Sequence, residues 1–165
     1  MTIVREVAEI IPVHMSIVYK DEIYMYRPTD IRWGTTIETL NELTFKDADA
    51  FSFHFPEGDL ENAKEAMDYI NSHYSDTCAA FQNNNHVDVC GVGCSKGTGI
   101  KHVINYFNIN ENDVYGIGDS WNDLPLLDGV KHGYTFTYAP LDVKDKAEKI
   151  VDSLAEAIQD ILKED

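Results

Sequence analysis

One short stretch, residues 113–128, constrains the fold of this chain more than any other. Val114, Tyr115 and Ile117 form an apolar, β-prone run that ends at residues 118–123, Gly-Asp-Ser-Trp-Asn-Asp. This order predicts a strand with Asp119 at its carboxyl end. Loops at that end of a strand build binding sites in open α/β sheets. The stretch therefore favours an α/β fold with a polar site where the strand ends.

The same stretch has a chemical and a structural interpretation. Asn122 and Asp123 fall at a predicted helix start, so two carboxylates and a carboxamide are kept close together. Oxygen donors of this kind suit Mg²⁺. Asp, Ser and Asn are also common in strand-to-helix turns for purely structural reasons. The hexapeptide alone leaves both interpretations open.

Composition and charge restrict the class of protein. The chain has 165 residues, 44% hydrophobic and 25% charged, and no apolar run long enough to span a bilayer. Without a basic, apolar leader it is expected to be soluble and cytoplasmic. The net charge of −16 argues against nucleic acid and anionic membranes as partners, so a phosphate ligand would need a local cation or metal.

The three cysteines do not form a metal or disulfide pattern. Cys78, Cys90 and Cys94 are odd in number, and no second Cys or His pair accompanies them. We expect buried or half-buried free thiols.

Residues 1–90 predict a small open α+β sheet. Helical spacing over residues 1–11 ends at Pro12, and residues 13–19 and 23–27 form a hairpin with a three-residue turn. A loop at Trp33-Gly34 and a short helix from Ile37 to Leu43 are expected next. The remaining elements are strands at 50–55, 77–81 and 86–92 and a helix at 60–73.

His54 lies in the first of those strands. Phe51, Phe53 and Phe55 alternate along it and predict one buried aromatic face, so His54 points to the other side. It is expected to be a half-exposed strand residue, and contact with a ligand is the alternative.

The sequence pattern changes at residues 91–99, which form a glycine-dense turn. Ser95 is a natural N-cap for the helix that follows, which places Lys96 in the first turn beside free backbone amides. A cation is unfavourable there unless an anion binds, although an exposed lysine would be tolerated at small cost. The spacing is not that of a Walker A loop.

The second part of the chain has the pattern of strands and helices that is typical of half of a doubly wound sheet. After the strand at residues 114–117, further strands are predicted at 133–138 and 149–151, with a closing amphipathic helix from Leu154 to Ile161. We therefore predict two domains, residues 1–90 and 91–165.

Two motifs occur together in this part of the chain. Lys96 lies in a Ser-Lys-Gly turn, and some twenty residues later a strand ends in the Gly-Asp-Ser-x-Asn-Asp loop. This combination resembles the second half of haloacid dehalogenase superfamily phosphatases, above all the Cof-like branch. The resemblance implies an α/β fold: a Rossmannoid half-core with a parallel sheet, joined to an α+β open-sheet cap that sets substrate specificity. Residues 86–165 match well, and residues 1–85 look like most of the cap.

The resemblance also implies roles for four residues. Lys96 would be the catalytic lysine that neutralises the phosphoryl group, and Asp119 the ligand of Mg²⁺. Asn122 would contact phosphate or organise the loop. Asp123, the second residue of the metal site, would hold a metal-bound water or Lys96. These groups supply the electrostatic part of phosphoryl transfer but no attacking group.

One family motif is missing. Members of the family carry an Asp-x-Asp-Gly-Thr nucleophile motif after an N-terminal strand, and this sequence has none. Asp47-Ala48-Asp49 precedes its strand and lacks the Gly-Thr. The chain thus resembles a family member that begins inside its cap.

Two functions remain from this resemblance. The favoured one is a Mg²⁺-dependent phosphatase of small phosphorylated metabolites such as sugar phosphates, inactive as this chain alone. The alternative is a non-catalytic binding or assembly module, and a chance motif in an unrelated α/β protein is a third interpretation. Residues 114–117 would form an unpaired strand edge, so a homo-oligomer, or a separate N-terminal half as partner, is expected.

Overall fold

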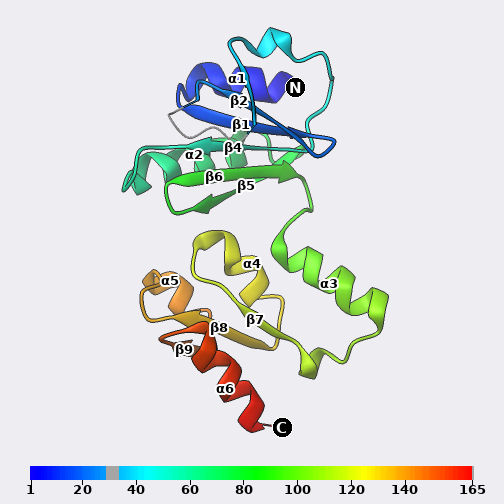
Figure 1. The fold of residues 1–165 in the computed structure, drawn as a ribbon, viewed down its shortest axis with the longest axis vertical. Coiled ribbons are helices and arrows are strands. Elements are labelled where there is room, and N and C mark those ends of the chain that lie inside the picture. Colours follow the sequence, from blue (N-terminus) through cyan, green and yellow to red (C-terminus); the bar gives the residue numbers. More distant parts are fainter. Residues whose placement is uncertain (29–33, 165) are drawn as a thin grey trace. The chain divides into compact units, whose positions relative to one another are not determined.

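The computed structural model describes residues 1–28 and 34–164, which divide into two compact units, Met1–Gly93 and Cys94–Asp165. Trp33, for which a loop was predicted, lies outside the described residues. Within them, no helix is long and apolar enough to cross a membrane. Each unit has its own sheet (Figure 1).

The N-terminal unit is a six-stranded sheet in the order β3-β2-β1-β4-β6-β5. All its neighbouring strands are antiparallel except β2 and β3. The elements are α1 (Thr2–Ile10), β1 (His14–Tyr19), β2 (Glu22–Tyr26), β3 (Thr35–Ile37), β4 (Ala50–His54), α2 (Leu60–His73), β5 (Cys78–Asn83) and β6 (His86–Gly91), with a 3₁₀ turn at Leu40–Glu42.

Both helices of this unit pack on one face of the sheet. Their buried side chains, including Val7 and Ile70, form a single core with inward-facing strand residues such as Met15, Phe53 and Val87. The alternation of β4 is as predicted, because Phe51 and Phe53 are buried while Ser52 and His54 lie on the opposite face and are half-buried. The open α+β sheet is confirmed.

Two local predictions in this unit are wrong. The hairpin turn has two residues, since Tyr19 pairs with Glu22, and Lys20 and Asp21 both have positive φ, as a type I′ turn requires. Ile37 ends a strand instead of starting a helix, because parallel pairing with β2 outweighs the helical spacing.

The C-terminal unit has a three-stranded parallel sheet in the order β7-β8-β9. Its elements are α3 (Lys96–Phe107), β7 (Tyr115–Ile117), α4 (Leu124–Leu127), β8 (His132–Phe136), α5 (Leu141–Lys144), β9 (Lys149–Val151) and α6 (Leu154–Glu164), with 3₁₀ turns at Glu111–Asp113 and Trp121–Asp123. Parallel strands alternating with helices confirm the predicted α/β class. Within the described residues, β7 has a neighbour on one side only.

None of the three cysteines forms a disulfide bond. Cys78 is buried and Cys90 half-buried, as expected, but Cys94 is exposed because it lies in the turn that precedes α3.

Candidate active site

The four residues singled out in the sequence, Lys96, Asp119, Asn122 and Asp123, all lie in the C-terminal unit, and two of them form an ion pair. The Lys96 ammonium forms an ion pair with Asp123 Oδ1. The Asp123 side chain is only 7% exposed, whereas that of Lys96 is 49% exposed. The unfavourable position of a lysine in a first helical turn is thus offset by a buried carboxylate.

Asp123 also organises the loop that contains Asp119. Its Oδ2 accepts hydrogen bonds from the backbone N–H groups of Asp119 at 2.9 Å and Ser120 at 3.2 Å. Both carboxylate oxygens are therefore engaged, which leaves the Asp119 carboxylate as the more accessible of the two acids. Asp123 acts as the anchor of the loop in this arrangement.

Gly118 makes this close approach of the loop to the strand end feasible. A Cβ at this position would lie 2.3 Å from Asp123 Cβ. The Gly118 backbone is fixed from the neighbouring strand, since its N–H donates to Tyr134 O at 3.1 Å and its carbonyl accepts from Thr135 Oγ1 at 2.7 Å. Glycine is required here because any side chain would displace the carboxylate.

A second glycine allows the start of α3 to approach α4 closely. Ser95 caps α3 by accepting a hydrogen bond from Thr98 N at 3.0 Å. A Cβ on Gly97 would lie only 2.1 Å from Pro125 O, so the backbones of the two helices touch at this glycine. This contact sets the distance between Lys96 on α3 and the loop before α4.

Asn122 has a buried acceptor without a partner. Its Oδ1 is inaccessible to solvent and, among the described residues, nothing donates a hydrogen bond to it. Burying an unpaired carbonyl oxygen is costly, so such atoms mark places where a donor or cation fits.

Three further residues of the site were not predicted from the sequence. Tyr138 follows β8 at the same edge of the sheet as Asp119; its partial burial and its interaction with the Asp119 carboxylate raise the pKa of the phenol. Trp121 Nε1 donates to Asp142 Oδ2 at 2.7 Å, which ties the loop to α5. Tyr138 could have been found, because the carboxyl ends of neighbouring parallel strands meet at one edge.

The oxygen atoms of the Asp119 loop are of the type that Mg²⁺ prefers, but they are few. Within residues 1–28 and 34–164, no three His, Cys, Asp or Glu side chains are grouped so as to hold a metal ion. Magnesium sites that act on phosphates commonly use one or two carboxylates and fill the other positions with waters and phosphate oxygens. Asp119 and the unpartnered Asn122 oxygen could supply the few protein ligands of such a site, with waters and phosphate oxygens as the others.

Comparison with known proteins matches residues 3–162 to the family described as haloacid dehalogenase-like hydrolase. A phosphoglycolate phosphatase of Nitrosopumilus maritimus is 32% identical over 99 residues, which are 59% of this chain and 40% of that protein. The curated relative is thus matched over less than half of its length.

Solved structures show the same fold. SMU.1108c from Streptococcus mutans UA159 superposes with a TM-score of 0.83 at 15% identity, over 98% of this chain and 66% of that one. The HAD subclass IIB sugar phosphatase BT4131 gives a TM-score of 0.76 at 21% identity, over 95% and 64%. The family match spans nearly the whole chain, and the chain therefore belongs to the haloacid dehalogenase-like hydrolases, with the fold of their Cof-like, subclass IIB branch.

Proposed function

We propose that this chain supplies the charge-stabilising part of a Mg²⁺-dependent phosphatase that acts on small phosphorylated metabolites such as sugar phosphates. The observation that carries the proposal is the Lys96–Asp123 ion pair beside the Asp119 loop. It holds a half-exposed ammonium against the loop that carries the Asp119 carboxylate, at the carboxyl end of a parallel strand, where such sites form. The relatives that are named as phosphatases support the same conclusion.

In this proposal each residue has a separate task. The Lys96 ammonium binds a phosphoryl oxygen and offsets its charge, while Asp123 keeps that ammonium in position. Asp119 would hold Mg²⁺, and the unpartnered Asn122 oxygen would accept a hydrogen bond from a metal-bound water or a protonated phosphate. When bound, the metal would stabilise the charge on the transferring phosphoryl group. All four residues stabilise charge and none attacks phosphorus.

The attacking group must then come from outside the 165 residues. The sequence contains no Asp-x-Asp-Gly-Thr. The solved relatives are longer, and the chain covers 66% and 64% of them. We propose that the Met1–Gly93 unit is the cap, that Cys94–Asp165 is the carboxyl-terminal part of the core, and that a further segment or chain brings the nucleophile.

A non-catalytic binding module is the second candidate, and the unpaired edge of β7 among the described strands favours it. Both candidates bind phosphate, but only the first requires Lys96 and Asp119 to act together with Mg²⁺.

NMR titration of the labelled chain with inorganic phosphate, with and without Mg²⁺, tests the proposal. We expect amide shifts centred on residues 95–98 and 118–123 that need Lys96 and are enhanced by Mg²⁺ through Asp119. Lys96→Met and Asp119→Asn should each abolish the corresponding response. Lys64→Met removes an exposed lysine of the other unit and should leave it intact. Shifts that are spread over the surface, or that persist in Lys96→Met, would contradict the proposal.

A further inference from the structure

Three histidines form a continuous row across the sheet of the N-terminal unit, on the face opposite α1 and α2. The strand register puts His14 of β1 opposite His54 of β4, and His54 opposite His86 of β6. Their ring centroids are 4.6 Å and 4.7 Å apart. We call His14, His54 and His86 the histidine ladder. The pairing of β1, β4 and β6 therefore keeps the backbones that carry the three rings side by side.

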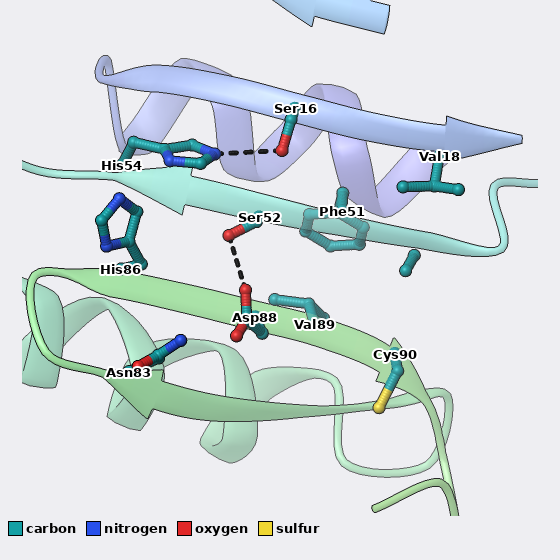
Figure 2. A pocket seen from close by; sticks show the side chains of 11 residues that line it. Ser16, Val18, Phe51, Ser52, His54, Asn83, His86, Asp88, Val89 and Cys90 are labelled. Atoms are coloured by element: carbon teal, nitrogen blue, oxygen red, sulfur yellow. Dashed lines mark hydrogen bonds between the residues drawn. The ribbon is translucent and has the colours of Figure 1, made fainter. Parts of the chain in front are cut away.

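A second row of polar residues runs beside the ladder. Ser16, Ser52 and Asp88 are opposite one another in the same register. Figure 2 shows that the Ser16 hydroxyl, 3.0 Å from His54 Nε2, joins the two rows. Within the second row, Ser52 donates a hydrogen bond to Asp88 at 2.8 Å. All residues of the two rows except His14 line a pocket of about 460 Å³. The Ser16–His54 hydrogen bond therefore joins β1 to β4 at the centre of the ladder.

Few acidic groups lie near the histidine ladder to stabilise a protonated imidazole. Among the described residues, Asp88 of β6 is the one carboxylate in these rows, and β5 contributes only the neutral Asn83 to the cavity. Directly after β2, the carbonyl oxygen of Arg27 is 3.1 Å from His14 Nδ1, while the Arg27 guanidinium donates to Ala8 O. The helices, with their charged side chains, pack on the other face.

These surroundings act on the central ring most strongly. Burial and then the neighbouring His14 and His86 lower the pKa of His54 to about 4, and Asp88 opposes this only in part. In the unfolded chain His54 would have the ordinary value of 6.5. The folded unit thus binds one proton fewer than the unfolded chain between these two values.

We propose that the histidine ladder is a proton-operated lock on the N-terminal unit. At neutral pH the uncharged His54 ring, which packs between His14 and His86 and is hydrogen-bonded to Ser16, holds β1, β4 and β6 together. In weakly acidic solution the ladder disfavours protonation, so the unfolded or locally opened state gains protons and this sheet loosens. The device is independent of phosphate chemistry and concerns the N-terminal unit alone.

The sign and size of the effect follow from linkage. A histidine whose folded pKa is depressed stabilises the fold fully above pH 6.5, and the contribution is lost as the pH falls toward 4. Each pH unit in this window changes the opening constant up to tenfold, so pH 5, which is 1.5 units below 6.5, gives about a thirtyfold change.

Hydrogen–deuterium exchange of the whole chain at pH 7.5 and pH 5, corrected for intrinsic exchange rates, tests the proposal. Protection of β1, β4 and β6 should fall about thirtyfold, and that of α3 and α6 should change much less. His54→Gln cannot titrate and should reduce the fall to a few-fold. His102→Gln replaces an exposed histidine of α3 and should behave as wild type.

Two outcomes would contradict the proposed role of the histidine ladder. One is equal loss of protection in both units, or an unchanged thirtyfold fall in His54→Gln. The other does not depend on that variant folding: an NMR titration of the wild-type imidazoles in which His54 protonates near pH 6.5 instead of about 4. A His54 ring that is still neutral at pH 5.5 supports the proposal.

Discussion

The Lys96 ammonium contacts Oδ1 of Asp123, while Oδ2 of the same carboxylate accepts two backbone N–H groups of the Asp119 loop. A single buried side chain thereby fixes both the lysine and the loop. Because the lysine is half-exposed and the aspartate buried, the two partners are not equivalent.

Asp123→Asn should destabilise the C-terminal unit more than an ordinary ion-pair substitution. The asparagine amide has one acceptor oxygen in place of two, so either Lys96 or the two loop N–H groups lose their partner. We expect a loss of about 2–4 kcal/mol in the free energy of unfolding, measured by urea denaturation. Asp68→Asn removes the exposed pair with Lys64 and should cost less than about 0.5 kcal/mol. Equal losses would refute the anchoring role of Asp123.

Two glycines of α3 provide a matched test of the contact with α4. A Cβ on Gly97 would meet Pro125 O, whereas at Gly99 nothing lies within 4 Å. Gly97→Ala should therefore cost about 1–3 kcal/mol through overpacking, and Gly99→Ala should stabilise the helix by up to about 1 kcal/mol. Thermal unfolding followed by circular dichroism would measure both. Destabilisation of similar size in the two variants would mean that the helices do not touch at Gly97.

Local patterns in the sequence predicted most of the elements. Ser95 as N-cap, Asp119 after β7 and the alternation of Phe51 and Phe53 all depend on spacing and on neighbouring residues. Such signals survive because amphipathic periodicity and capping act over a few residues.

What the sequence could not provide depends on pairing between distant segments. The helical spacing around Ile37 was overridden by strand pairing with β2, and nothing near Asp142 in the sequence indicates that it lies beside the Asp119 loop. The histidine ladder is a similar case, since His14, His54 and His86 become neighbours only through the register of three strands.

Magnesium should bind weakly to this chain alone. Asp119 is the one carboxylate of the loop whose oxygens are not both engaged by Lys96 and backbone N–H groups, and waters would have to fill most positions. Isothermal titration calorimetry should show no site in the low micromolar range, and Asp119→Asn should remove the residual heat. A tight site, or one that is indifferent to this substitution, would contradict the account.

The free edge of β7 should recruit a partner. Within the described residues, β7 pairs only with β8, and Val103, Tyr106 and Phe107 of α3 are exposed apolar side chains in the same unit. Exposed strand edges and apolar surface both favour association. The charge of −16 opposes pairing of like chains but is screened over about 10 Å at 0.1 M salt. Light scattering at this salt should give a mass above 18.7 kDa, and a monodisperse monomer would exclude self-association.

The central claim is that this chain stabilises phosphoryl charge without providing the nucleophile, and the most direct test is hydrolysis of an aryl phosphate by the purified 165-residue protein with Mg²⁺. The account predicts no turnover above background, because in the proposed roles Lys96 and Asp119 stabilise charge and neither attacks phosphorus. Asp119→Ala, purified in parallel, should give the same background rate. Magnesium-dependent turnover that is lost in Asp119→Ala would contradict the claim, since it would show that the nucleophile lies within these residues.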